Sequence, residues 1–277
     1  MRWQKIKLRV HEYQLEEAWK RLTDAGFKPL LIKGWSAAQY YDEPSERRFN
    51  DLDLAFAPED FKSVEVFLEK EVKSLTIDTH NGLKHLDTQS FEKLFANSRI
   101  VKCGKTDIRV LSQEDHLRVL CVHWLIDGGA KKDKLWDIYY AVKNRPSDFD
   151  WDECLSVVSQ VRQRWIICTI GLTHKYLGLD VSDTPIAESI KDLPEWLIKA
   201  VEKEWESDTV IVPLHFLLND WKSFIKQLKK RIPPNPIQAT VEMEGDFDKY
   251  PRFVYQIKNF FYRTFPFISR ILKRLKN

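Results

Sequence analysis

Three aspartates stand at alternating positions within two short apolar runs of the chain. Asp51 and Asp53 are one residue apart in DLDLAFA (51–57), and Asp78 lies in SLTIDTH (74–80). On a strand this spacing puts Asp51 and Asp53 on one face while the intervening leucines face the core. Side-by-side carboxylates repel each other, but they suit a hard divalent cation. Three carboxylates on neighbouring strands therefore predict a two-metal site for phosphoryl transfer, with all three aspartates as catalytic metal ligands.

A second set of residues is suited to binding phosphate. The apolar run PLLIKG ends at Gly34, and a strand that ends in glycine and opens a helix presents backbone N–H groups to anions. Lys33 and Ser36 flank this turn, and Arg47 lies on the loop before the aspartates. These residues predict a nucleotide-binding set of Lys33, Gly34, Ser36 and Arg47.

Several of these residues also have a structural interpretation. For Arg47 the alternative is a salt bridge to Asp42 or Glu46, both of which precede it on the same loop. In the later part of the chain, Asp137 and His123 are candidates for a base that activates an acceptor hydroxyl. For Asp137 the alternative is a buried acid with satisfied hydrogen bonds.

The elements that position these residues follow from hydrophobic periodicity. The expected helices cover 13–27, 36–43 and 58–73, and the expected strands cover 29–34, 51–57, 74–80 and a hairpin over 99–112. From residue 113 the pattern becomes helical, with expected helices over 113–126, 134–144, 150–178, 194–205 and 212–232. The sequence predicts an α+β fold with a small α/β domain over 1–112, a mainly helical domain over 113–232, and a linker with a basic C-terminal segment over 233–277.

Composition places the chain among globular proteins. Hydrophobic residues make up 43% and charged residues 31% of the 277 residues. No apolar run approaches the roughly 20 residues of a membrane span, and the start lacks the apolar core of a signal peptide. The four cysteines form no CxxC pair, which favours reduced thiols and a cytoplasmic protein.

The C-terminal segment concentrates the positive charge. Residues 251–277 contain seven Lys or Arg and no acid. Ile257, Phe261 and the apolar residues after them recur at helical spacing, and Pro266 is expected to kink or end the helix. The segment either packs its apolar face on the helical domain, binds RNA, or binds an anionic membrane surface.

The order of these motifs resembles that of a known family. LLIKG, then YYDEPSERRFNDLDLAF, then IDTH, and later VLSQEDHLRVLCVHW, KLWDIYYAV and DWDECL, resemble the uncharacterised bacterial nucleotidyltransferases of the DNA polymerase β-like superfamily. The resemblance covers roughly residues 14–180. Trp35 departs from the superfamily, which has a small or hydroxyl residue after its glycine. The resemblance assigns metal binding to Asp51, Asp53 and Asp78, the phosphate-binding turn to Gly34, and nucleotide contacts to Lys33 and Arg47.

The resemblance implies a Mg²⁺-dependent nucleotidyltransferase, with Mn²⁺ as the alternative ion. Such an enzyme moves a nucleoside monophosphate from an NTP, with ATP favoured, to a hydroxyl or phosphate acceptor and releases pyrophosphate. A small molecule or a peptide natural product is the expected acceptor, although its identity stays open. The alternatives are an enzyme that acts on RNA or protein and a catalytically degenerate NTP-binding module.

Overall fold

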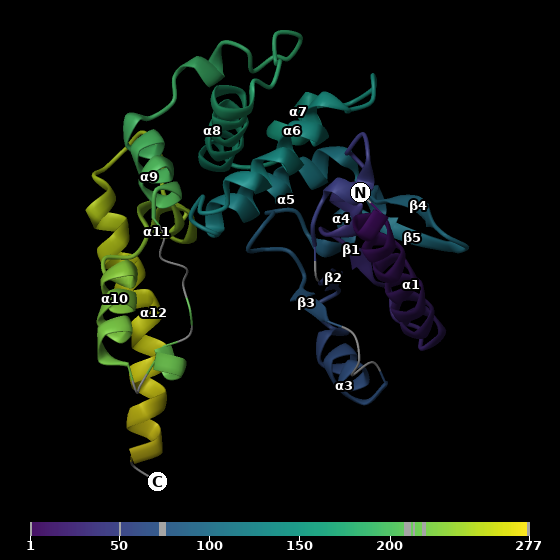
Figure 1. The fold of residues 1–277 in the computed structure, drawn as a ribbon, viewed down its shortest axis with the longest axis horizontal. Coiled ribbons are helices and arrows are strands. Elements are labelled where there is room, and N and C mark those ends of the chain that lie inside the picture. The colour runs from purple at the N-terminus through teal and green to yellow at the C-terminus, as the bar shows by residue number, and fades with distance from the viewer. Residues whose placement is uncertain are drawn as a thin grey trace.

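The chain folds into a mixed α+β structure with a five-stranded sheet near its N-terminus and a mainly helical remainder (Figure 1). The computed structural model describes residues 2–49, 51–71, 76–207, 212, 214–217 and 220–275. The α+β fold class predicted from the sequence is confirmed. The boundaries of the predicted domains stay a prediction.

The elements alternate in the first part of the chain and are helical afterwards. The strands are β1 (Leu30–Leu31), β2 (Leu52–Phe56), β3 (Ile77–Asn81), β4 (Arg99–Cys103) and β5 (Thr106–Val110). The helices of this part are α1 (Arg2–Asp24), α2 (Trp35–Ala38), α3 (Phe61–Glu71) and α4 (Phe91–Asn97). The later helices are α5 (Gln113–Ile126), α6 (Leu135–Lys143), α7 (Trp151–Leu155), α8 (Gln160–Leu177), α9 (Glu195–Trp205), α10 (Trp221–Arg231), α11 (Pro236–Glu242) and α12 (Arg252–Leu275).

The strands that carry the aspartates are neighbours in the sheet. The strand order is β3-β2-β1-β5-β4, with β2 parallel to β3 and antiparallel to β1. Asp53 is the register partner of Asp78, so these two side chains project from the same face of adjacent strands. The expectation that the two aspartate-bearing strands lie side by side is confirmed.

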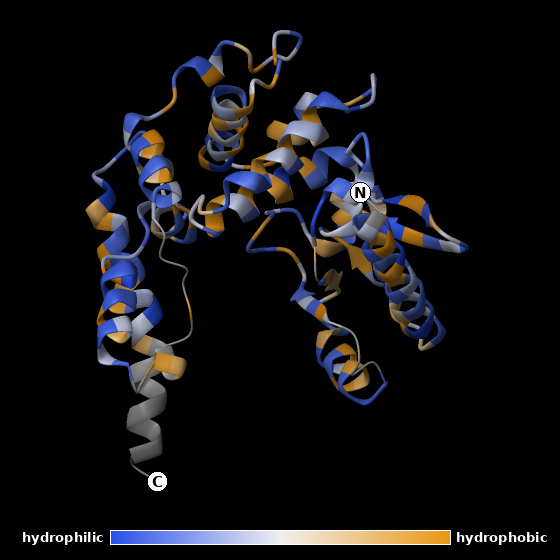
Figure 2. Cartoon of the chain, in the orientation of Figure 1, coloured by the Kyte–Doolittle hydropathy of each residue, from blue (hydrophilic) through white to orange (hydrophobic). Residues whose placement is uncertain are grey.

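Both faces of the sheet are covered, and its central strands are hydrophobic (Figure 2). Leu31 and Leu54 pack in a cluster with Leu15 and Leu22 of α1. Residues that point to the opposite face, such as Leu30, belong to a cluster that continues through α5, α6 and α8. This alternation of faces follows the two-residue period of a strand. The sheet and the helices therefore share a core, which fixes α5 and α6 against the aspartate-bearing strands.

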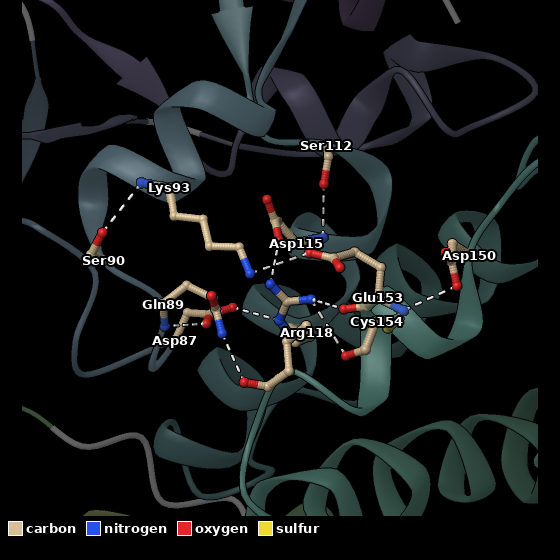
Figure 3. A network of polar contacts seen from close by, with 11 residues as sticks. Asp87, Gln89, Ser90, Lys93, Ser112, Asp115, Arg118, Asp150, Glu153 and Cys154 are labelled. Atoms are coloured by element: carbon tan, nitrogen blue, oxygen red, sulfur yellow. Dashed lines mark hydrogen bonds and ion pairs between the residues drawn. The ribbon is translucent and has the colours of Figure 1, made fainter.

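A buried charged cluster fastens α5 to its surroundings (Figure 3). Arg118 of α5 is 1% exposed, and its Nε donates to Asp87 Oδ2 at 2.7 Å. Its guanidinium also donates to Asp115 and, at 2.8 Å, to the carbonyl oxygen of Glu153 in α7. Asp87 lies between β3 and α4, so the cluster joins the segment after β3 to α5 and α7. Charges this deeply buried are stable only when paired and hydrogen-bonded, as they are here.

Side-chain caps begin helices at positions where hydrophobic periodicity predicts no boundary. The expected helix over 150–178 is two helices, because Ser159 begins α8 by accepting a hydrogen bond from Arg162 N. Asn235 caps α11 in the same way, with Pro236 at the first helical position. The proline-rich stretch that suggested a linker therefore begins a helix.

The last helix, α12, packs on α11 through polar and aromatic residues. Asn259 is 0% exposed and donates to Glu242 Oε2 at 2.6 Å, and Tyr255 is buried against Gly245. Ile257 and Phe261, which the packing interpretation assigned to the buried face, are 52% and 56% exposed.

The rest of α12 bears on two further expectations. The helix continues to Leu275, so of the two outcomes expected at Pro266 the end of the helix is wrong, and the kink stays a prediction. The apolar and basic side chains expected after Phe265 lie outside the described residues. Among the residues that the structure describes, no helix combines the length and apolar character of a membrane span.

Candidate functional site

A cavity of about 410 Å³ lies between the aspartate-bearing strands and helices α5 and α6. This volume is within the usual range for small-molecule sites, about 300–1,000 Å³. Most of the residues predicted from the sequence meet there, namely Lys33, Gly34, Arg47, Asp51, Asp53 and Asp78. Ser36 does not line this cavity, so we do not include it among the residues proposed to bind phosphate.

Two of the predicted carboxylates form a compact donor group with a histidine. Asp53 is 5% exposed, Asp78 is exposed, and each has an oxygen within 4.8 Å of the other and of a ring nitrogen of His80. Asp51 lies just before β2 and lines the same cavity, but it is not a member of this group. The sequence interpretation gave His80 no role, although the pattern Asp-x-His places it on the same strand face as Asp78.

Lys33 balances the charge of the buried carboxylate. Its Nζ lies 2.8 Å from Asp53 Oδ1 and 2.8 Å from His123 Nε2. Burial alone would raise the pKa of Asp53, but the contact of His80 and the charge of Lys33 outweigh burial and lower this pKa to about 2. Asp53 is therefore ionised at neutral pH and available to a cation.

Arg47 and Asp137 form a buried ion pair across the cavity wall. Arg47 Nε and Nη2 donate to the two oxygens of Asp137 at 2.7 and 2.8 Å. Tyr41 donates its hydroxyl to Asp137 Oδ1 at 2.6 Å. The partner of Arg47 is therefore Asp137, and the expected salt bridge to Asp42 or Glu46 is absent among the described residues.

This pairing bears on the role of each partner. Burial alone would raise the pKa of Asp137, but the charge and hydrogen bonds of Arg47 outweigh burial and hold the pKa below its usual value. A carboxylate held on both oxygens is a structural group and a poor candidate for a catalytic base. Arg47 Nη1 is buried without a hydrogen-bond partner among the described residues, which leaves one donor of the guanidinium for a ligand.

The turn after β1 is shaped by residues that point away from the cavity. Gly34 has a φ of 65°, which a side chain would disfavour. Trp35 is 2% exposed in the cluster under α1, and its Nε1 donates to Glu12 Oε1 at 3.3 Å. Ser36 donates its hydroxyl to the carbonyl oxygen of Lys33 at 3.1 Å. The tryptophan that departs from the superfamily pattern is therefore a core residue.

Three further cations line the cavity, and the sequence interpretation assigned them no role. They are Arg48 from the loop before β2, and Lys131 and Lys134 from the segment between α5 and α6. Within the described part of the chain, the side chains of Arg48 and Lys131 have no ion pair. Arg48 is the sequence neighbour of Arg47 on the loop before the aspartates, whereas no local pattern reveals Lys131 and Lys134, because only the fold brings them to this cavity.

His123 of α5 completes the wall near Lys33. An ammonium group can only donate, so His123 Nε2 accepts from Lys33 and the proton lies on Nδ1, which is 3.6 Å from Asp127 Oδ2. Burial and the neighbouring Lys33 lower the pKa of His123. Its accepting nitrogen is already occupied, so this arrangement does not present His123 as a free base.

Comparison with known proteins identifies the family. The sequence model described as "Uncharacterised nucleotidyltransferase" matches residues 2–72 and 68–178, a range that includes every cavity residue named above. No curated protein and no solved structure matches the chain significantly. With its sheet, its paired aspartates and this match over more than half its length, the chain belongs to the uncharacterised nucleotidyltransferase family.

Proposed function

We propose that this protein transfers a nucleoside monophosphate from an NTP to a hydroxyl or phosphate acceptor and releases pyrophosphate. Membership of the family supports nucleotidyltransferase activity in general. The finer proposal is that the reaction depends on Mg²⁺ or Mn²⁺, that ATP is the first candidate donor, and that the acceptor is a small molecule or a peptide natural product.

One observation carries the proposal. Asp53 and Asp78 are register partners on parallel strands and line a cavity to which Arg48, Lys131 and Lys134 also contribute, together with further acidic and apolar residues. The same cavity therefore holds carboxylates, which attract divalent cations, and unpaired cations such as Arg48 and Lys131, which attract phosphates. An NTP bound with its metal carries both kinds of charge, so it matches the cavity at both ends.

The donor set fits a divalent ion. Asp53 and Asp78 would hold the ion, and Asp51 lines the same cavity as a further carboxylate. The buried nitrogen of His80 faces the same group without a hydrogen bond. When bound, the ion supplies Lewis-acid stabilisation of the charge that develops on the phosphoryl group.

The chain's own cations bind and orient the polyphosphate. Lys33 contacts Asp53. When a divalent ion pairs with this carboxylate, the ammonium group of Lys33 is available to a phosphate oxygen. Arg47 is fixed by Asp137 and presents its free Nη1, whereas Arg48 and Lys131 contribute unpaired charge. Because these groups are already in place, they act mainly by positioning and electrostatics.

A neighbouring pocket of about 240 Å³ is our candidate for the acceptor site. It shares Arg47, Arg48 and Lys134 with the main cavity and adds Tyr41 and Trp136. An acceptor there is adjacent to the phosphates and reaches them without crossing the metal ligands. The aromatic side chains give this pocket an apolar wall against which part of the acceptor packs.

The proposal is tested by incubating the protein with each NTP labelled at the α-phosphorus, a divalent ion and a metabolite extract. Mass spectrometry then identifies what has gained a nucleotide. Asp53→Asn is the matched control, because it removes a ligand charge with little change in size. Label on a small molecule or peptide that depends on Asp53 supports the proposal.

Other outcomes of this experiment separate the alternatives. Label on RNA or on protein places the acceptor in another class. Binding of NTP without transfer to any extract component favours the degenerate binding module. Transfer that persists in Asp53→Asn contradicts the assigned metal site.

A further inference from the structure

We propose that His80 is a third ligand of the metal site and that its imidazole nitrogen makes this site prefer Mn²⁺ to Mg²⁺. The inference deepens the proposed function and rests on its metal site. His80 follows Asp78 by two residues on β3, so the two side chains leave the same face of the strand. Asp53 lies beside them on the parallel strand β2.

The distances fit three atoms around one ion. His80 Nε2 lies 3.5 Å from Asp53 Oδ1 and 3.6 Å from Asp78 Oδ2. Ligand atoms that are each about 2.1 Å from an octahedral ion lie about 3.0 Å apart when adjacent and about 4.2 Å apart when opposite. The two contacts exceed the adjacent distance by about half an ångström, so a small movement of the side chains would let all three atoms bind one ion, and both contacts are too long for strong hydrogen bonds.

The nitrogen that faces the carboxylates has no other partner. His80 Nε2 is buried, and among the described residues nothing forms a hydrogen bond with it. Most buried side-chain polar atoms have a hydrogen-bond partner, and an exception calls for an explanation. A metal ion bound at Nε2 supplies the missing partner.

The other ring nitrogen is already engaged. His80 Nδ1 lies 3.3 Å from His85 Nε2, and the two ring planes are parallel to within 3°. Metal-binding histidines commonly use one nitrogen for the ion and the other for a group that fixes the ring orientation. His85 is therefore the positioning residue of His80.

A purely electrostatic role for His80 explains less. Asp53 already has a cation, because Lys33 Nζ lies 2.8 Å from the same oxygen that faces His80. A neutral imidazole adds a nitrogen that can bind a metal ion, whereas the ammonium group of Lys33 can only donate hydrogen bonds. Only the role of a metal ligand explains why His80 Nε2 is buried without a hydrogen-bond partner among the described residues.

A nitrogen ligand changes which ions the site selects. Mg²⁺ prefers oxygen ligands in near-ideal octahedral geometry and keeps much of its water. Imidazole nitrogen binds first-row transition ions more strongly than it binds Mg²⁺. A site of two aspartates and His80 should therefore gain affinity from the histidine for Mn²⁺ and very little for Mg²⁺.

The experiment measures metal binding directly, without turnover. Tag-free protein is titrated with Mn²⁺ and with Mg²⁺ by calorimetry, and bound Mn²⁺ is examined by pulsed electron paramagnetic resonance for coupling to an imidazole nitrogen. The variants are His80→Asn and His80→Gln, with melting temperatures measured for both. His174→Asn controls for loss of an exposed histidine, and Asp53→Asn controls for loss of the site.

We expect a nitrogen coupling in the wild type that both His80 variants lose. Their Mn²⁺ affinity should fall by about 10-fold to 100-fold, as for other groups that tune metal sites, with Mg²⁺ affinity nearly unchanged. Equal losses for both ions, or no nitrogen coupling in the wild type, would overturn the role of His80 while the metal site stands. Undiminished binding in Asp53→Asn would instead contradict the metal site of the proposed function.

Discussion

At the scale of single residues, Lys33 neutralises the buried carboxylate of the cavity. Its ammonium group contacts Asp53 on one side and His123 on the other, each at 2.8 Å. The lysine is 8% exposed, and such a buried cation is stable because a carboxylate compensates it. A ligand that competes for Asp53 therefore also releases a cation toward the phosphates.

Replacing this lysine should separate phosphate binding from base binding. We predict that Lys33→Ala weakens NTP binding by about 10-fold to 100-fold, given about 1.5–3 kcal/mol for a hydrogen bond to a charged group. Binding of the bare nucleoside should change much less. Calorimetric titration of both ligands is the measurement, with the exposed Lys28→Ala as the control. Equal losses for the two ligands would assign Lys33 to structure alone.

His116 should make stability depend on pH. It is fully buried with Nδ1 2.8 Å from the Tyr40 hydroxyl, and burial, together with the charges of Arg99 and Arg47, lowers its pKa to about 3. The unfolded chain binds a proton near pH 6.5, while the folded protein does not. Stability is therefore lost as pH falls below about 6.5, by up to about 1.4 kcal/mol per pH unit from this residue.

Denaturant unfolding at several pH values checks the prediction. Between pH 7 and pH 5, the free energy of unfolding of His116→Asn should depend less steeply on pH than that of the wild type, by a difference that approaches one proton near pH 5. His174→Asn, at an exposed histidine, is measured in parallel as the control. An unchanged slope in the His116 variant would show that this residue takes up its proton over the same pH range in the folded and unfolded protein.

Among the elements, the turn from β1 into α2 has the tightest steric requirement at the site. A Cβ on Gly34 would lie 3.2 Å from Asp51 O, and the φ of this glycine is +65°. Gly26 also has a positive φ, of +86°, but a Cβ there would meet nothing within 4 Å. Comparing substitutions at the two glycines therefore distinguishes the effect of backbone strain from the effect of a steric contact with the site.

We predict that Gly34→Ala and Gly26→Ala both lower the melting temperature, since strained backbone costs about 1–3 kcal/mol per residue. Only Gly34→Ala should also weaken Mn²⁺ and NTP binding, because it pushes against the backbone that leads into β2. Thermal melts and binding titrations on both variants test this. Similar binding losses in the two variants would refute a specific role for the Gly34 turn.

Pairings that depend on local patterns can be predicted from the sequence, whereas pairings between distant segments cannot. The pairing of Asp53 with Asp78 was predictable, because strand alternation and the helix that connects the two parallel strands are both visible as local patterns. The pairing of Arg47 with Asp137 was not, because the two residues are 90 positions apart and meet only when α6 packs beside the sheet. The positions of Lys131 and Lys134 at the cavity were unpredictable for the same reason. The break between α7, which ends at Leu155, and α8, which Ser159 caps, differs from the single helix expected over 150–178, because a capping hydrogen bond leaves no mark in the hydrophobic periodicity.

At the scale of the whole molecule, α12 stabilises the helical part from outside. Glu242 of α11 accepts hydrogen bonds from Asn259 and Arg263, and Arg252 lies 4.5 Å from the ring of Trp196. Removing α12 would leave Glu242 without these donors and uncover the surface against which Tyr255 packs.

A chain that ends at residue 250 should therefore melt at a lower temperature than the full chain. Phe261→Ser is the matched control, because this side chain is 56% exposed and surface substitutions usually change stability by less than about 0.5 kcal/mol. Melting curves and co-sedimentation with RNA and anionic vesicles are measured on the same proteins. An unchanged melting temperature with weaker, salt-sensitive co-sedimentation would support the electrostatic interpretations of this segment instead.

Nucleotidyl transfer differs from other reactions of ATP in the phosphorus atom that enters the product, and two labelled forms of ATP test this most directly. In parallel reactions with a divalent ion and the acceptor extract, ATP is labelled at either the α- or the γ-phosphorus. Nucleotidyl transfer predicts that the α label enters the product and that the γ label is released in pyrophosphate, with neither event in Asp53→Asn. Entry of the γ label into the product, or its release as free phosphate without transfer of the α label, would contradict nucleotidyl transfer.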